Sequence, residues 1–363
     1  MESLIHDWDG ECVIVRYDTA AHAWMFIAIH DRTLGMALGG CRFKGYTSPR
    51  EALRDALRLA RGMTYKWAAV ELPFGGGKAV VAPMRALDAA QRESLLLRFG
   101  DILESLAGLY GTGIDLGTTP ADMNIIGRRA RWVFGRTPEE GGSGDPGPWT
   151  AKGVYAGLQA ACAHVFNGSA LAARTVLVQG TGSVGAPLAR RLAVDGARVL
   201  IADAIPARVK ALAEEIGADV VMPEAVYSTP CDVFAPCAIG GILNQRSISR
   251  LECRIVAGSA NNQLERDEDA ELLHGRGILY VPDFVINAGG AIAHASLEVM
   301  RWTEEETAKR IDRIRNMVAE ILELSADAGE SPLHEATRRS ERVLEDARAA
   351  KRKGSVDASE VAR

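Results

Sequence analysis

Apolar residues change their spacing along the first third of the chain, and each spacing predicts a different element. The runs Cys12–Arg16 and Ala23–His30 are rich in β-branched and aromatic residues and predict strands, and the shorter run Ala79–Ala82 predicts another. After Ser48, and again from Asp88 to about residue 107, apolar residues recur at helical spacing. Ser48 is followed by a proline and, three residues on, by a glutamate, which is typical of a helix N-terminus.

Beyond the middle of the chain, short apolar runs alternate with helical patterns. Strands separated by helices of about 10–15 residues indicate βαβ units and a parallel sheet. The expected strands are Thr175–Gln179, Arg198–Ala202, Val220–Met222, Asp232–Ala235, Arg254–Ala257 and Ile278–Val281. A long helix begins at the capping pattern Thr303–Glu306, and further helical turns cover about residues 336–349.

The segment Glu139–Pro148 is rich in glycine and proline and lacks large apolar residues, so we expect a linker there. The predicted fold class is therefore α/β with two domains, an N-terminal α/β domain at 1–140 and a parallel α/β domain at 145–325. Residues 326–350 are expected to form a C-terminal helix, and the polar residues 351–363 a disordered tail.

The composition is that of an ordinary globular protein. Of 363 residues, 47% are hydrophobic and 25% are charged, which excludes a mostly disordered chain. No run approaches the roughly 20 apolar residues of a membrane-spanning helix, and the acidic N-terminus lacks a signal region, so we expect a cytoplasmic protein. A net charge of −5 provides no basic surface for nucleic acid. The six cysteines are scattered without metal-ligand spacing, so we expect reduced, mostly buried thiols and no metal.

A glycine-rich loop follows the expected strand Thr175–Gln179 and opens a helix. The loop consists of Gly180, Thr181, Gly182, Ser183, Val184 and Gly185. Such a loop binds a pyrophosphate because its glycines allow a tight turn and close approach, and because free N–H groups at the helix start face the charge. Asp203 ends the next strand, where a carboxylate binds ribose hydroxyls and repels a 2′-phosphate. The second domain is thus predicted to be a Rossmann domain that binds NAD rather than NADP.

Four motifs stand out in the first domain. They are Gly39-Gly-Cys-Arg42, Met63-Thr-Tyr-Lys66, Leu72-Pro-Phe-Gly-Gly-Gly-Lys78 and Gly113-Ile-Asp115. Three glycines before a lysine indicate a backbone that approaches another group closely. Each motif alone also has an ordinary explanation, such as a surface lysine or a turn aspartate.

Together and in this order, these motifs resemble the leucine/phenylalanine/valine dehydrogenases, a branch of the glutamate dehydrogenase superfamily. The resemblance spans about residues 10 to 350 and continues in the segments 144–150, 234–244, 257–262 and 282–290. It implies NAD-dependent, reversible oxidative deamination of an apolar L-amino acid to a 2-oxo acid and ammonia, in a cleft between the two domains. It also implies a homo-oligomer that associates through the first domain, to which the C-terminal helix returns.

The resemblance implies a role for individual residues. Lys66 would bind the substrate carboxylate, Lys78 would be the catalytic base, and Asp115 would move protons on the amino nitrogen. Gly39, Gly40 and Asn262 would line the substrate. Cofactor contacts would include, besides the glycine-rich loop and Asp203, the residues Thr150, Cys237, Ala238 and Asn287.

The chemistry requires such residue types. Water must add to the iminium that hydride removal leaves, and an ordinary lysine with a pKa of about 10.4 is a poor base near neutral pH. Burial beside a second cation would lower that pKa, and we expect Lys66 to be the cation beside Lys78.

The substrate side chain depends on four positions that the resemblance places in its pocket, namely Leu38, Gly113, Ala291 and His294. The small residues at 113 and 291 leave space, which favours a phenylalanine-like substrate, with leucine, valine, tyrosine or tryptophan as alternatives. His294 either forms part of the pocket wall or binds a polar atom of an aromatic substrate. Two other function classes stay open: a catalytically silent NAD(H) sensor and a hydroxy-acid dehydrogenase. The sequence contains no evident additional cation for the second carboxylate of glutamate.

Overall fold

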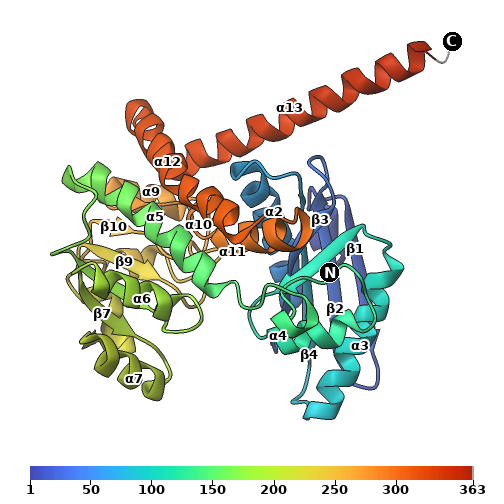
Figure 1. Ribbon diagram of the computed structural model, residues 1–363, viewed down its shortest axis with the longest axis horizontal. Coiled ribbons are helices and arrows are strands. Elements are labelled where there is room, and N and C mark those ends of the chain that lie inside the picture. The colour runs from blue at the N-terminus through green and yellow to red at the C-terminus, as the bar shows by residue number, and fades with distance from the viewer. Residues whose placement is uncertain (362–363) are drawn as a thin grey trace. The chain divides into compact units, whose positions relative to one another are not determined.

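The computed structural model describes residues 1–361, and their side chains through Arg352. The chain divides into two compact units (Figure 1). Unit 1 contains residues 1–145 and the residues from 338 onward, and unit 2 contains residues 146–337. The division therefore falls inside the glycine- and proline-rich segment Glu139–Pro148.

Unit 1 is built on a five-stranded mixed sheet in the order β1-β2-β4-β3-β5. Its strands are β1 (Cys12–Asp18), β2 (Ala23–Asp31), β3 (Ala37–Phe43), β4 (Gly75–Pro83) and β5 (Tyr110–Ile114). β2 is antiparallel to β1 and β4, whereas β3 runs parallel to β4 and β5. The helices are α1 (Glu2–His6), α2 (Pro49–Ala69), α3 (Ala89–Ser105), α4 (Pro120–Gly127) and a 3-10 turn at Pro138–Glu140.

The two faces of this sheet are covered by different helices. Side chains alternate along a strand, so Phe26 and Val80 pack on the face covered by α2, while Ile27 and Val81 join the core of α3 on the other face. The predicted helix start is confirmed, because the Ser48 hydroxyl accepts a hydrogen bond from the Glu51 N–H. By the same alternation, the even-numbered positions of β4 face α2.

Unit 2 contains a six-stranded, all-parallel sheet in the order β11-β10-β9-β6-β7-β8. The strands are β6 (Thr175–Gln179), β7 (Arg198–Ala202), β8 (Asp219–Val220), β9 (Val233–Pro236), β10 (Ile255–Val256) and β11 (Leu279–Tyr280). Counted from β6, this is the strand order 3-2-1-4-5-6 of the doubly wound dinucleotide-binding fold. The strand order reverses between β6 and β9, which is where such sheets bind ligands. The predicted α/β class with a Rossmann domain is confirmed.

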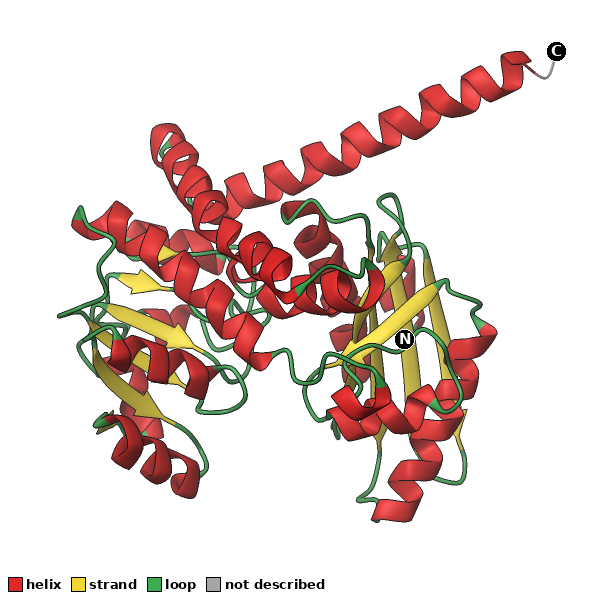
Figure 2. Ribbon diagram, viewed as in Figure 1, coloured by secondary structure: helices red, strands yellow, loops and turns green. Residues whose placement is uncertain are grey.

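Helices surround this sheet, as the red and yellow ribbons of Figure 2 show. They are α5 (Gly147–Phe166), α6 (Gly185–Val194), α7 (Pro206–Ile216), a 3-10 turn (Pro223–Ser228), α8 (Gln245–Ile248), α9 (Asp269–Gly275), α10 (Asp283–Ile286), α11 (Gly289–His294), a π-helical turn (Ala295–Val299) and α12 (Glu304–Ala328). The predicted capping box of α12 is confirmed: the Thr303 hydroxyl accepts from the Glu306 N–H, and the Glu306 carboxylate accepts from the Thr303 N–H.

The last helix, α13 (Pro332–Val361), belongs to unit 1 from residue 338 onward. Arg339 donates to Glu71 at 2.7 Å, and Tyr65 donates to Glu341 at 3.3 Å. The expectation of a disordered tail at 351–363 is wrong for residues 351–361, whose backbone continues the helix, and residues 362–363 lie outside the described residues.

Other sequence predictions need smaller corrections. β6 and β7 have the predicted bounds, but β8 ends at Val220 instead of Met222, because Pro223 begins a 3-10 turn. All six cysteines are free; Cys41 and Cys162 are buried and the other four are half-buried. Within the described part of the chain, no helix is both long and apolar enough to cross a membrane.

Candidate active site

Lys78 lies in the middle of the sheet of unit 1, on the face that α2 covers. It is an even-numbered residue of β4, and only 4% of its side chain is exposed. The glycines before it leave no room for side chains: a Cβ on Gly76 would lie 2.0 Å from the Thr64 hydroxyl of α2. Gly76 thus lets β4 pack directly against α2, whereas Gly75 and Gly77 allow other close approaches: their Cβ atoms would lie 2.5 Å from the Asp31 carbonyl and 2.7 Å from the Tyr110 ring.

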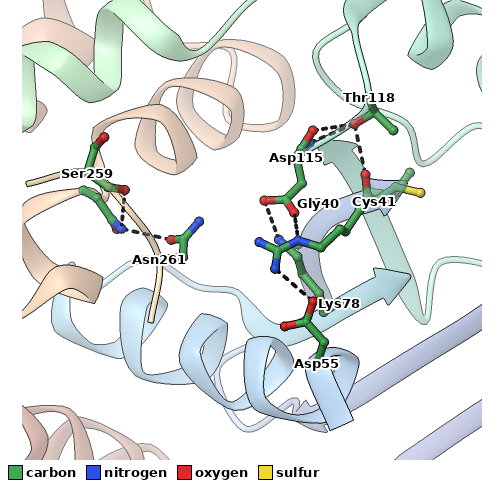
Figure 3. A network of polar contacts seen from close by, with 12 residues as sticks. Gly40, Cys41, Asp55, Lys78, Asp115, Thr118, Ser259 and Asn261 are labelled. Atoms are coloured by element: carbon green, nitrogen blue, oxygen red, sulfur yellow. Dashed lines mark hydrogen bonds and ion pairs between the residues drawn. The ribbon is translucent and has the colours of Figure 1, made fainter. Parts of the chain in front are cut away.

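Asp115 follows the end of β5 and meets Lys78. Its Oδ1 atom lies 3.0 Å from Lys78 Nζ, and 9% of the Asp115 side chain is exposed. The turn after β5 holds this residue, because the Asp115 N–H donates to the Thr118 hydroxyl and that hydroxyl donates to the Cys41 carbonyl, both at 2.9 Å (Figure 3). A Cβ on Gly40 would lie 2.8 Å from Asp115 Cβ, so glycine at position 40 makes room for the carboxylate.

Arg42 of β3 completes the cluster around Asp115. Its Nε donates to Asp115 Oδ2 at 2.7 Å, and its NH1 donates to Asp55 Oδ2 of α2 at 3.0 Å. Tyr46 also donates to Asp55, with an oxygen–oxygen distance of 2.5 Å. Two buried cations and two carboxylates therefore alternate in one chain of charge-assisted hydrogen bonds (Figure 3).

This cluster changes the acidity of its members. Burial lowers the pKa of Lys78, Asp115 opposes that shift, and repulsion from Arg42 adds to it. Burial would raise the pKa of Asp115, but Lys78 and Arg42 hold it well below its ordinary value. Arg42 is thus a repelling cation that the sequence did not predict, and the expectation that Lys66 repels Lys78 stays a prediction. Lys78 is thus an amine that loses its proton more easily than an ordinary lysine, next to a carboxylate that stays ionised.

The remaining candidates of unit 1 lie around these residues. Lys66 is buried in the last turn of α2, with 7% of the residue exposed. Gly40 and Gly113 are paired neighbours on β3 and β5. Leu38 is buried on the same strand as Gly39, and its carbonyl accepts from Trp67 Nε1 at 2.9 Å. The structure therefore brings Lys78, Asp115 and the glycines of β3 and β5 together, as the motifs predicted.

In unit 2, the glycine-rich loop lies at the carboxyl end of β6. Gly180 has a φ of +98°, and a Cβ on Gly185 would lie 1.8 Å from the Gly180 carbonyl, so both glycines serve the strand–turn–helix geometry. A Cβ on Gly182 would meet no protein atom within 4 Å. This open space, together with the N-terminus of α6, fits the pyrophosphate of a dinucleotide. Thr181, Ser183 and Val184 complete the loop.

Asp203 lies beside this loop at the end of β7. Its carboxylate accepts from the Thr181 N–H at 2.7 Å and from the Ile205 N–H at 2.9 Å. Burial opposes ionisation, but these hydrogen bonds lower the pKa of Asp203 below its ordinary value. A negative charge is therefore fixed at the position where the fold binds a ribose.

The other cofactor candidates lie along the same edge of the sheet. Cys237 follows β9 and donates its N–H to Gln179 at 2.7 Å, and Ala238 is next to Gly180. Thr150 is in the first turn of α5, where a Cβ on Gly290 would approach its hydroxyl to 2.4 Å. All of these residues come from loops that follow strands or from helix starts, as expected for a ligand site of this fold.

Asn287 is the most deeply buried polar candidate of unit 2. Its Nδ2 donates to the Ser259 carbonyl at 3.1 Å and to Asn261 Oδ1 at 2.9 Å, and these two partners are labelled in Figure 3. Its Oδ1 has no partner in the protein. Asn262 follows Asn261 in the chain and has a φ of +51°. A buried acceptor without a protein partner is costly, and a water molecule or a ligand donor can complete it. Ala291 and His294 lie on α11, where His294 is 9% exposed.

Sequence reasoning missed several members of these networks. Arg42 stands inside a motif that was singled out, yet received no role. Asp55 and Tyr46 had no signal, because a helix aspartate and a loop tyrosine are common at surfaces. Ser259 and Asn261 lie in the segment 257–262 that carried the resemblance, but only Asn262 was selected there.

Comparisons with known proteins agree with this arrangement. Residues 14–139 match the family described as "Glu/Leu/Phe/Val dehydrogenase, dimerisation domain", and residues 200–352 match "Glutamate/Leucine/Phenylalanine/Valine dehydrogenase". A leucine dehydrogenase from Geobacillus stearothermophilus is 43% identical over 88% of this chain and 86% of its own length. A valine dehydrogenase from Streptomyces albus is 38% identical over 96% of both chains.

A solved structure is similar over nearly the whole chain. The crystal structure of L-tryptophan dehydrogenase from Nostoc punctiforme has a TM-score of 0.77 and 35% sequence identity, and the match covers 96% of this chain and 100% of that chain. Fold, buried cluster, glycine-rich loop and sequence relatives lead to the same conclusion: the chain belongs to the glutamate/leucine/phenylalanine/valine dehydrogenase family and is an amino acid dehydrogenase, an oxidoreductase.

Proposed function

We propose that this protein catalyses the NAD-dependent oxidative deamination of an apolar L-amino acid. The amino acid, NAD⁺ and water become the 2-oxo acid, ammonium, NADH and a proton, and the reaction is reversible. The observation that carries the proposal is the buried Lys78–Asp115 pair, with an Nζ–Oδ1 distance of 3.0 Å. An amine with a lowered pKa beside an ionised carboxylate is suited to moving protons in such a reaction.

The proposed division of labour follows from charge. Lys66 holds the substrate carboxylate with a fixed positive charge, next to Gly39 and Gly40. Bound NAD⁺ would accept a hydride from the substrate Cα. Neutral Lys78 then takes a proton from the water that adds to the iminium carbon. Asp115, which Lys78 and Arg42 keep ionised, would accept a proton from the amino nitrogen and pass it on rather than hold it.

The choice of NAD over NADP rests on Asp203. A carboxylate fixed by the Thr181 and Ile205 N–H groups would accept ribose hydroxyls and repel a 2′-phosphate. Asn287 Oδ1 supports a nucleotide ligand further, because it is a buried acceptor that still lacks a donor.

Replacing Asp203 with Ser should weaken the preference for NAD, because repulsion of the 2′-phosphate disappears. The ratio of kcat/KM for NAD to that for NADP should fall at least about tenfold, which corresponds to about 1.4 kcal/mol. The matched control is Asp219→Ser, which removes an exposed carboxylate that pairs with Arg198 on the surface of unit 2. Equal use of both cofactors by the unmodified protein would contradict the assignment.

The preferred side chain is proposed to be phenylalanine-like. Gly113 and Ala291 are small where branched-chain members of the family tend to carry bulkier residues. Leucine and valine are the alternatives that the relatives favour, because a leucine dehydrogenase and a valine dehydrogenase are both about 40% identical to this chain. Tyrosine or tryptophan is the alternative if His294 binds a polar atom of the side chain, and a relative from Nostoc punctiforme is an L-tryptophan dehydrogenase.

A substrate panel tests the function and the side chain together. We expect NADH formation with L-amino acids, and the highest kcat/KM with Phe among Phe, Tyr, Trp, Leu, Ile and Val. If Leu or Val exceeds every aromatic substrate about tenfold, the size argument is wrong. If Tyr or Trp is the best substrate and His294→Val reverses the order, His294 binds the polar atom of the aromatic side chain. Absence of NADH formation with every amino acid would instead favour the silent-sensor reading.

The protein is further proposed to be a homo-oligomer. The support is the match of residues 14–139 to a family described as a dimerisation domain. A related glutamate dehydrogenase from Thermus thermophilus, 25% identical with a TM-score of 0.76, is described as hetero-hexameric.

A further inference from the structure

Arg42, like Asp55, is a member of the buried cluster in unit 1 to which neither the motifs nor the proposed reaction assigns a role. It is 13% exposed at the side chain, and it uses two different edges of its guanidinium group. Nε donates to Asp115 and NH1 donates to Asp55, with distances of 2.7 and 3.0 Å. A planar guanidinium can hold two carboxylates at fixed angles, whereas a lysine ammonium acts as a point charge.

Asp55 in turn is fixed from a second side. Tyr46 donates to the same oxygen, Oδ2, that Arg42 binds. Asp55 comes from α2, Arg42 from β3 and Asp115 from the end of β5, so one side chain connects three elements around Lys78. Such a clamp fixes the orientation of the Asp115 carboxylate, whose other oxygen then faces Lys78 Nζ.

The charges of the cluster also balance through Arg42. With Lys78 protonated, Lys78 and Arg42 carry two positive charges, and Asp55 and Asp115 carry two negative charges. Without Arg42, the same cluster would carry a net charge of −1 and would bind the Lys78 proton more tightly. Because burial weakens the screening of charges by solvent, loss of the Arg42 charge should have a large effect on the pKa of Lys78.

We propose that Arg42 is a positioning residue for the reaction: clamped by Asp55, it holds the Asp115 carboxylate against Lys78 and balances the charge of the buried cluster. The inference rests on the proposed roles of Lys78 and Asp115. Arg42 itself stays protonated, because the two carboxylates raise its pKa further against the effect of burial. It therefore transfers no proton and acts only through its neighbours.

The other ionisable groups described around Lys78 do not supply the positive charge of Arg42. Cys41 of β3 and Tyr110 of β5 are buried, and burial raises the pKa of each, so both stay neutral. Burial lowers the pKa of His30 on β2, and its ring is bonded to Thr64 and Asp9. The α2 cations Arg61, which acts on His30, and Lys66 are unchanged in the variants that follow.

The test compares Arg42→Gln with Arg42→Lys. In Arg42→Gln, loss of the repelling charge should raise the pKa of Lys78, so the rise of kcat/KM with pH should move to higher pH by about one unit or more. Arg42→Lys keeps the positive charge but lacks the planar guanidinium group that holds both carboxylates. Its pH profile should therefore lie close to that of the unmodified protein, while kcat stays low. A purely structural loss would lower the rate equally at every pH.

A second readout does not depend on turnover. Trace labelling of lysines with acetic anhydride at a series of pH values, read by peptide mass spectrometry, reports the protonation of Lys78 directly. Its midpoint should move upward by about one unit or more in Arg42→Gln. The matched control is Arg98→Gln, which removes another arginine that donates to a buried carboxylate, that of Asp18 at 3.1 Å, on the far side of the sheet.

The outcomes separate the two ideas. An unchanged labelling midpoint in Arg42→Gln, or an equal shift in Arg98→Gln, overturns the inference about Arg42. A shifted midpoint in a protein that oxidises no amino acid upholds the electrostatic role and overturns the proposed function. A shifted midpoint together with a shifted rate profile supports both.

Discussion

Lys78→Ala should lower kcat for amino acid oxidation about a thousandfold or more while leaving NAD binding nearly unchanged. General base catalysis contributes about 10²–10⁴ in rate, and the variant removes the one amine that the buried cluster makes easier to deprotonate. The dinucleotide site is unaffected, because the glycine-rich loop and Asp203 belong to unit 2. The measurements are steady-state kcat at saturating substrate and the dissociation constant of NADH by fluorescence.

The control for this variant is Lys309→Ala, which removes an exposed lysine of α12 that pairs with Glu305. It should retain full activity. If Lys78→Ala keeps more than about a tenth of the unmodified kcat, a barrier change below about 1.4 kcal/mol, Lys78 is not the base. A large loss of NADH binding would indicate instead that the variant disturbs the protein as a whole.

Asp115→Asn should also reduce kcat, by about a hundredfold or more, because the amide cannot exchange protons with the amino nitrogen. Its effect on pH dependence should be opposite to that of Arg42→Gln. The Asp115 carboxylate raises the pKa of Lys78, so its removal leaves burial and Arg42, which lower that pKa, opposed by the smaller effect of Asp55. The residual activity should therefore rise at lower pH than in the unmodified protein.

The measurement is kcat/KM between about pH 6 and pH 11, which brackets the range below the ordinary lysine value of about 10.4. Asp101→Asn serves as control, since this aspartate is 60% exposed on α3 and pairs only loosely with Arg129 at 3.8 Å. A shift of the Asp115→Asn profile toward higher pH would contradict the charge arrangement described for the cluster. Activity near that of the unmodified protein would remove Asp115 from the mechanism.

Fixed charges around Lys78 illustrate why the family assignment alone does not explain the chemistry. The resemblance implied that two lysines lie in the site, and a separate chemical argument predicted that Lys66 lowers the pKa of Lys78. In the structure, the repulsion on Lys78 comes from an arginine of β3, and a carboxylate from α2 holds that arginine. The Lys78–Asp115 pair thus depends on Arg42, which its motif contained without a role, and on Asp55, which belongs to no motif.

The sequence determined most of unit 2 by itself. β6 and β7 have the predicted bounds because strands buried on both faces appear as continuous apolar runs, which a local reading detects. The glycine-rich loop and Asp203 follow these strands directly, so their position at the edge of the sheet is a consequence of local spacing. The helix N-termini at Ser48 and Thr303 could also be predicted from the local sequence, because a capping side chain accepts from an N–H only three residues away.

Only the tertiary structure decided β3, β5 and the cluster that they carry. Ala37–Phe43 and Tyr110–Ile114 are rich in glycine and have weak intrinsic preference for strands, but β3 pairs with β4 on one side and with β5 on the other, and β5 forms the edge of the sheet. Arg42 and Asp55 are separated by 13 residues on a strand and a helix, and Arg42 and Asp115 by 73, and no local pattern encodes either pairing. The physical reason is that charge pairing in a buried cluster depends on which faces of the sheet and helix meet, and that is fixed by packing over the whole unit.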